Sequence, residues 1–73
     1  MQRFLIVIER AEGNYSAYSP DLLGCISTGR TVEEVKENMR EAIQLHLQGL
    51  QEDGLPVPQP TSTADYVMVA ESA

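Results

Sequence analysis

An amphipathic helix with its own start and stop signals is the feature that most constrains this chain. Thr31 and Glu34 have the T-x-x-E spacing of a capping box, in which the Thr31 hydroxyl accepts from the Glu34 N–H and the Glu34 carboxylate accepts from the Thr31 N–H. Gly54, followed by Leu55 and Pro56, is typical of a left-handed cap residue and a proline that cannot continue a helix. The sequence therefore predicts one helix between Thr31 and Gly54.

The apolar residues of this helix lie on one face. They recur at spacings of three and four, which is the signature of a single apolar stripe on a 3.6-residue helix. Such a face packs against another layer, and here we expect a sheet. His46 lies on this stripe, so we expect a hydrogen-bonded core or interface histidine and not a catalytic one. The stripe comprises Val32, Val35, Met39, Ala42, Ile43, His46, Leu47 and Leu50.

Four other segments have strand patterns. Residues 3–9, RFLIVIE, are apolar on both faces, as expected of a central strand or of one paired across an oligomer interface. Residues 15–19 alternate in a strand-like way, and the turn residues 12–14 join these two segments as a hairpin. Residues 25–28 form a short third strand after the loop, and residues 66–70, YVMVA, form the fourth. Tyr15 and Tyr18 fall on opposite faces of the second strand.

The element order β-β-β-α-β predicts an α+β fold. A crossover from the third strand through the helix to the fourth strand must be right-handed and must return parallel. We therefore expect the sheet order 3-2-1-4, with residues 3–9 inside the sheet and the helix on one face. The proline-rich residues 56–63 form an extended connector within this fold, so that residues 1–73 are one domain. The other sheet face stays uncovered.

Size and charge indicate what the chain binds. A domain of 73 residues buries only about 60% of the surface that its unfolded chain exposes. Cys25 has no disulfide partner and no cluster of metal ligands is visible, so we expect a homo-oligomer, either a dimer or a tetramer. Eleven acidic and five basic residues give a net charge of -6, which repels nucleic acid and favours a basic protein partner.

The longest apolar run is short. Residues 4–8 can neither cross a membrane nor serve as the core of a signal peptide. A single cysteine agrees with a reducing compartment, because secreted proteins of this length more often carry an even set. We therefore expect a cytoplasmic protein without membrane contacts.

Enzymatic chemistry has few candidates. Cys25 has no basic neighbour in sequence to lower its pKa, so we expect a buried anchor of the loop. With one His and one Cys, a zinc site would need carboxylates, an unusual ligand set. A nuclease of the RNase H type needs several carboxylates around paired metal ions. The available ones are Glu9, Glu12, Asp21, Glu34 and Asp65, and Glu34 is better explained as a cap. We therefore expect no catalytic residue, metal or cofactor.

The loop before the helix has two interpretations. In one, the run PDLLG is a structural turn in which Asp21 caps backbone N–H groups and one leucine is buried. In the other, Asp21 and an exposed leucine form the edge of a partner-binding surface. The acidic helix residues are either a solvated face or a field that steers a basic partner. The candidate partner-binding residues are Pro20, Asp21, Leu22, Glu33, Glu37 and Glu41.

These motifs occur in a recognisable order. A short hairpin precedes YSPDLLGCISTGRTVEEVKENMREAIQLHLQGL, which leads into GLPVPQP. This resembles the HicB family of antitoxins, whose core has a Pro-Asp-x-x-Gly-Cys loop, a Gly-x-Thr-x-x-Glu helix start and a Gly-x-x-x-Pro exit. The resemblance covers nearly the whole chain, and the order of the motifs makes it more specific than any one of them.

The resemblance implies a fold and a function. HicB-like domains have a partially degraded RNase H-like fold, and family members neutralise HicA, a small basic mRNA interferase, by covering its catalytic histidine. We therefore expect an antitoxin that masks a HicA-type toxin. The alternatives are an orphan oligomeric interaction or scaffold domain without a toxin, and a residual metal-dependent nuclease. Fuller family members carry a C-terminal DNA-binding domain, and we expect this chain to be a short form without it.

Overall fold

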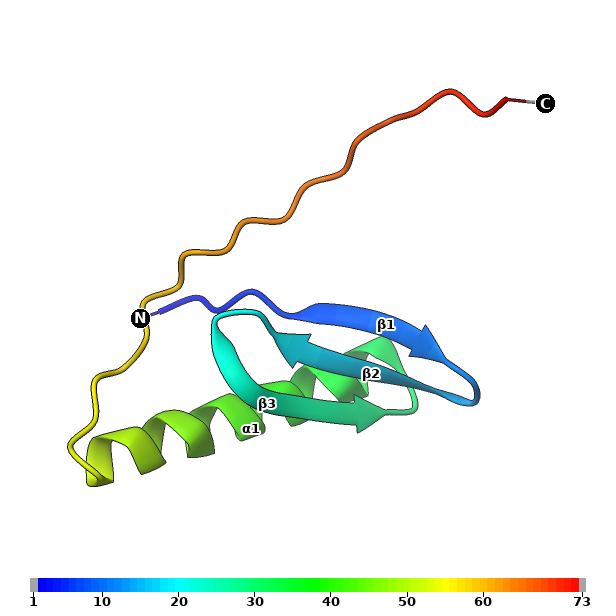
Figure 1. Cartoon of the computed structure of the whole chain (residues 1–73). Coiled ribbons are helices and arrows are strands. Elements are labelled where there is room, and N and C mark those ends of the chain that lie inside the picture. The colour runs from blue at the N-terminus through cyan, green and yellow to red at the C-terminus, as the bar shows by residue number, and fades with distance from the viewer. Residues whose placement is uncertain (1, 73) are drawn as a thin grey trace.

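The fold is a three-stranded sheet with one helix packed across it. A computed structural model describes residues 2–72. The elements are β1 (Val7–Ala11), β2 (Asn14–Ser19), β3 (Leu22–Gly29) and α1 (Val32–Glu52). Figure 1 shows the sheet and the helix as two layers, with an extended C-terminal segment leaving them. The predicted α+β class and the order of the first four elements are confirmed.

The sheet is antiparallel throughout, in the order β1-β2-β3. Ala11 pairs with Asn14, which leaves a two-residue turn containing Gly13 at a φ of +81°. A positive φ in such a turn favours glycine, and this turn sets the register of the hairpin. The predicted hairpin and the 3-2-1 part of the predicted sheet order are therefore confirmed.

The predicted fourth strand is not formed within the single chain. Residues 55–72 contain no strand, so β1 is an edge strand and the predicted interior position of residues 3–9 is wrong for this chain. The position of α1 gives a physical reason, because the helix packs mainly on β3 and β2. A strand added beyond β1 would lie past the cover that this helix provides.

The turn between β2 and β3 is followed by a bulge. Ser19 pairs with Leu22, but the next pair is Tyr18 with Ile26, so residues 23–25 are extra on the β3 side. Gly24 lies within this bulge at a φ of +82°, a conformation that side chains disfavour. The third strand is therefore longer than predicted, and the bulge resets which of its residues face the helix.

The helix begins at a capping box with one difference from the prediction. The Glu34 N–H donates to the Thr31 hydroxyl at 3.0 Å, as expected. The Glu34 carboxylate accepts from the Arg30 N–H at 3.1 Å and not from the Thr31 N–H. The second bond ties the helix start to the end of β3, because Arg30 directly follows that strand.

The helix ends in a Schellman motif. Gly54 adopts a φ of +68°, its N–H donates to the Gln51 carbonyl at 3.1 Å, and the Leu55 N–H donates to the Leu50 carbonyl at 2.9 Å. These are the two reversed bonds that define the motif and satisfy the last carbonyls of a helix. The predicted left-handed cap at Gly54 is confirmed.

The core between the two layers is small. Its buried apolar residues are Ala17, Leu22, Cys25, Val35 and Met39, and half-buried residues of the N-terminal segment, β1, β2 and α1 pack around them. Tyr15 is among the latter, whereas Tyr18 is 42% exposed on the other sheet face, as their spacing predicts. Within residues 2–72, no helix is both long and apolar enough to span a membrane.

Candidate partner-binding surfaces

The predicted partner-binding residues do not form one surface. Pro20 and Asp21 lie in the turn between β2 and β3, and Leu22 lies directly after it. The three glutamates lie on α1, which begins beyond the far end of β3 (Figure 1). Glu33, in the first turn of the helix, is therefore near the end of the sheet opposite to Asp21.

The prediction that Leu22 contacts a partner is wrong. Its side chain is 1% exposed and belongs to the core, whereas Leu23 is 95% exposed. Consecutive residues of an extended chain point to opposite sides, so burying one leucine of this pair exposes the other. The loop thus has a buried leucine, as its structural interpretation required, and an exposed one at the next position.

The Asp21 carboxylate binds the C-terminal segment. The Ser62 hydroxyl donates to it at 2.8 Å, the Ser62 N–H at 3.2 Å and the Thr61 hydroxyl at 3.2 Å. The bond from the Ser62 side chain is the main reason that the pKa of Asp21 lies below its usual value. We call Asp21, Thr61 and Ser62 the Asp21 clamp. The polar run after the prolines was its only signal in the sequence.

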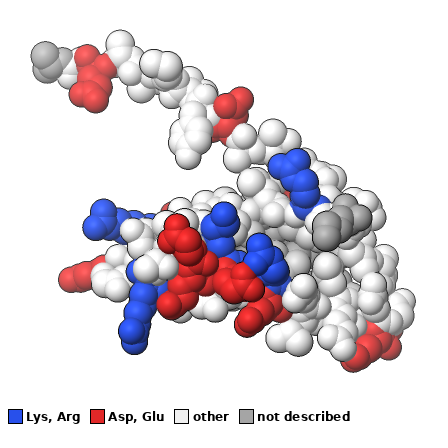
Figure 2. Space-filling model, turned by 180° about the vertical axis from the view of Figure 1, so that it is seen from behind, with Lys and Arg blue, Asp and Glu red and all other residues white. Residues whose placement is uncertain are grey.

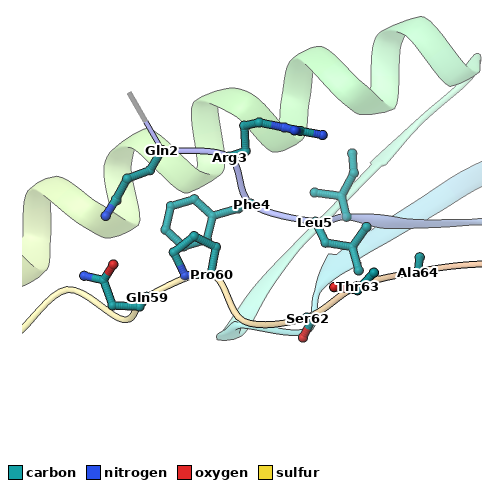
Figure 3. Close-up of a pocket in the computed structure, with 10 residues that line it drawn as sticks. Gln2, Arg3, Phe4, Leu5, Gln59, Pro60, Ser62, Thr63 and Ala64 are labelled. Carbon is teal, nitrogen blue, oxygen red and sulfur yellow. The ribbon is translucent and has the colours of Figure 1, made fainter.

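A cleft separates the C-terminal segment from the N-terminal one. Its volume is about 750 Å³, and residues 2–6, 59–60 and 62–64 line it. Figure 3 shows Phe4 and Pro60 extending from these two segments, which run side by side here. Arg3 is the only charged residue in this lining, so the cleft lacks the paired acid and base that proton-transfer catalysis needs.

The sheet face turned away from the helix carries an apolar row. Val7 pairs with Tyr18 across the first hairpin, and Tyr18 pairs with Ile26 across the second. Paired residues share a face, so the three side chains cross the sheet as one row, which we call the outer-face row. Ile26 is 70% exposed. An exposed tyrosine beside aliphatic side chains is typical of protein interfaces.

The glutamates of the helix are exposed among basic neighbours. Glu33, Glu37 and Glu41 are spaced by four and lie along one side of α1. Glu37 forms an ion pair with Arg40, one turn further along. Figure 2 shows acidic and basic side chains close together on that view of the molecule. The glutamates therefore lie in a mixed-charge surface, on the helix layer and away from the outer-face row.

The remaining chemical candidates are dispersed. Cys25 is buried, as predicted, and burial raises the pKa of its thiol, which opposes thiolate formation. Glu34 caps the helix and Asp21 forms the clamp, so neither is free to act elsewhere. Across residues 2–72 there is no group of three or more His, Cys, Asp or Glu side chains that could hold a metal ion. The geometry thus provides surfaces suited to binding a partner protein.

Comparisons with known proteins identify the family and several relatives. The model of the HicB-like antitoxins of bacterial toxin–antitoxin systems matches residues 4–72. A UPF0150 protein from Helicobacter pylori is 47% identical over 67% of this chain and 68% of its own length. A second UPF0150 protein, from Synechocystis, is 39% identical over 77% of this chain and 72% of its own length. A 14.9 kDa protein of Haemophilus phage HP1 is 36% identical, and the match spans 47% of that protein.

A solved structure has a similar fold. A chain of the HicA3 and HicB3 toxin–antitoxin complex superposes with a TM-score of 0.65 at 29% identity. The match covers 81% of this chain and 72% of that one. The similarity thus extends beyond the hairpin motifs to most of the fold.

Proposed function

The chain belongs to the family of HicB-like antitoxins, and from this we propose that it neutralises a HicA-type mRNA interferase by covering the toxin's active site. The observation that carries the proposal is the family match over residues 4–72. The similarity to a chain from a toxin–antitoxin complex supports it, because that complex pairs a HicA with a HicB protein. The mechanism is steric masking, which requires tight binding and no chemistry from this chain.

The outer-face row is the best docking surface for the toxin. Tyr18 and Ile26 are adjacent and exposed on a face that no other element of the described chain covers, and Leu23, which lies in β3 like Ile26, is also exposed. Binding energy at protein interfaces concentrates in a few such buried anchors, with tyrosine prominent among them. Pro20, beside Asp21 in the adjoining turn, is exposed and extends this surface.

The acidic helix residues serve a different purpose in this proposal. Glu33, Glu37 and Glu41 lie on the helix layer, so they act on a basic toxin at long range. A net charge of -6 favours encounter with such a partner, and charges outside the contact change association rates more than dissociation rates. The glutamates thus steer the toxin and the apolar row holds it.

Co-expression with a HicA-type toxin, followed by pull-down and an RNA-cleavage assay, tests this function. The wild-type chain is expected to bind and to suppress cleavage. Ile26→Asp is expected to weaken binding by about 30-fold, since interface anchors contribute about 2 kcal/mol or more. The matched control is Leu45→Asp on α1, which makes the same kind of change at a position that is also 70% exposed.

The outcomes separate the function from the surface. The antitoxin function and the outer-face row are both supported if the complex suppresses cleavage, survives Leu45→Asp and is weakened by Ile26→Asp. Equal effects of the two substitutions reject the outer-face row while keeping the antitoxin function. No complex with the toxin encoded beside this chain rejects the antitoxin function and leaves an orphan interaction domain.

A further inference from the structure

Two arginines line a small hollow at one corner of the sheet. The hollow has a volume of about 290 Å³ and lies between the turn of the first hairpin and the junction of β3 with α1. Its lining residues are Arg10, Ala11, Gly13, Asn14, Tyr15 and Arg30. We call this hollow the arginine pocket.

The strand register brings the two arginines to the pocket from different elements. Arg10 on β1 pairs with Tyr15 on β2, and Tyr15 pairs with Gly29 on β3. Arg30 directly follows Gly29. Neighbouring strands lie about 4.8 Å apart, so β1 and β3 are roughly 10 Å apart, with Tyr15 between them. Two long side chains at this spacing can hold one ligand from both sides.

The charges of the two arginines are not neutralised by neighbouring carboxylates. Within residues 2–72 no carboxylate forms an ion pair with Arg10 or Arg30, and the pocket lining contains no acidic residue. Glu12 adjoins the pocket in sequence but does not line it, and the Glu34 carboxylate accepts from the Arg30 backbone N–H at 3.1 Å. Two of the five basic residues of an acidic chain are thus gathered at one place with their charges available.

The hydrogen-bond donors of the pocket select the class of anion. Each guanidinium carries five N–H donors in a planar fork that matches two oxygens of an anion at once. Two such forks offer more donors than the two oxygens of a carboxylate can use. A phosphate ester presents three acceptor oxygens and a charge of about -2, so it can occupy both forks. The pocket therefore suits a phosphate group better than a carboxylate.

The size of the pocket and the charge of the chain limit what carries the phosphate. RNA and DNA are polyanions, and a net charge of -6 repels every phosphate along them. A small molecule presents only the phosphates that the pocket holds. The volume of about 290 Å³ is close to that of the smallest ligand sites, which is roughly 300 Å³.

We propose that the arginine pocket binds the phosphate or pyrophosphate group of a small phosphorylated molecule, with Arg10 and Arg30 each holding one side of the group. Alternate residues of a strand face opposite ways, so Arg10 lies on the other sheet face from Val7 of the outer-face row. The pocket is therefore separate from the surface proposed for the toxin, and binding there does not depend on that proposal.

Titration of the full chain with inorganic pyrophosphate, followed by NMR at constant ionic strength, tests the site. The side-chain Nε–Hε resonances of Arg10 and Arg30 are expected to shift together with the backbone amide of Tyr15. Arg10→Gln with Arg30→Gln is expected to raise the dissociation constant by about 100-fold, because hydrogen bonds to charged groups contribute about tenfold or more each. Both arginines are exposed, so the circular dichroism of this variant is expected to match the wild type.

A matched control removes the same charge elsewhere. Arg3→Gln with Arg40→Gln changes two exposed arginines outside the pocket and is expected to leave pyrophosphate binding unchanged, because salt screens distant charges. An equal loss of affinity in both variants would overturn the proposal, since net charge and not a defined site would then attract the anion. Arginine resonances that do not respond to pyrophosphate would overturn it as well.

Two further titrations separate the classes of ligand. Acetate and a short single-stranded RNA are each expected to bind more weakly than pyrophosphate at the same ionic strength. Acetate that binds as tightly would reject the phosphate group as the ligand. RNA that binds more tightly, and shifts the same two arginine resonances, would reject a small molecule and assign the pocket to a nucleic acid.

Discussion

At the scale of single residues, Asp21 connects two distant parts of the chain. Its carboxylate lies in the turn after β2 and accepts hydrogen bonds from residues 40 and 41 positions further along. Both carboxylate oxygens accept, one from the two hydroxyls and the other from the Ser62 N–H. An ionised carboxylate is the form that accepts best, so the clamp depends on the charge of Asp21.

Acidification is expected to release this clamp. Hydrogen bonds from Ser62 lower the pKa of the folded Asp21 below the value of 3.8 for a free side chain. A depressed carboxyl pKa means that the clamp is fully stable above the unfolded pKa and is lost as the pH falls through the folded pKa. The backbone amide resonance of Ser62, followed by NMR through an acid titration, should shift with that loss.

The matched variant is Asp21→Asn, which keeps the shape of the side chain and removes its titration. Its Ser62 resonance should show no transition in the acid range. A Ser62 resonance that stays constant in the wild type while the Asp21 carboxyl titrates would contradict the clamp.

Local chemistry of single residues could be predicted only where its partners are close in sequence. The Thr31 cap and the Gly54 cap follow from spacings of a few residues, and both are confirmed. The partners of Asp21 are far along the chain, and no local rule selects Thr61 and Ser62. One interpretation of the loop buried a leucine without saying which one, and the other placed Leu22 on the partner surface, although Leu22 is buried. The bulge in β3 shifts the alternation of faces that a sequence pattern assumes.

At the scale of elements, the end of β3 lies very close to the start of α1. Of the five glycines, Gly29 at this contact has the least room for a side chain. A Cβ on Gly29 would lie 2.6 Å from the Val35 nitrogen and 2.9 Å from its Cα. These are backbone atoms of the helix, so they cannot move aside as a flexible side chain would. Glycine at this position therefore allows the first turn of α1 to approach the end of the sheet.

Gly29→Ala is expected to destabilise the fold. Overpacking of this kind costs about 1 to 3 kcal/mol, and for a domain of this size each kcal/mol lowers the melting temperature by about 4 to 8 °C. Gly49→Ala is the control, since its Cβ would meet nothing within 4 Å and alanine favours a helix. Thermal unfolding of both variants checks this, and an unchanged melting temperature for Gly29→Ala would refute the close contact.

Element types followed from local patterns more reliably than element pairing did. The hairpin, the third strand and the helix were each predicted from periodicity and turn residues, and all are present. The apolar character of residues 3–9 on both faces predicted an interior strand, whereas the structure places β1 at the edge of the sheet. Pairing of a fourth strand depends on where α1 lies across the sheet, and residue periodicity contains no information on that position.

At the scale of the whole molecule, a small core is combined with a large net charge. The core has five buried apolar residues, and the net charge is -6. The charge opposes compaction of the isolated chain and favours its encounter with a basic protein. Three of these charges come from the helix layer, which lies behind the surface proposed to contact the toxin. They belong to Glu33, Glu37 and Glu41.

Neutralising these three glutamates is expected to slow toxin binding without weakening the bound complex. The triple change Glu33→Gln, Glu37→Gln and Glu41→Gln takes the net charge from -6 to -3. Stopped-flow kinetics should give an association rate reduced by about tenfold at low salt, a weaker salt dependence and an unchanged dissociation rate. A control triple change at Glu12, Glu52 and Glu71 removes the same charge from other places. Equal slowing by both variants would show that net charge alone steers the toxin. A faster dissociation rate for the helix variant would show that its glutamates lie inside the contact with the toxin.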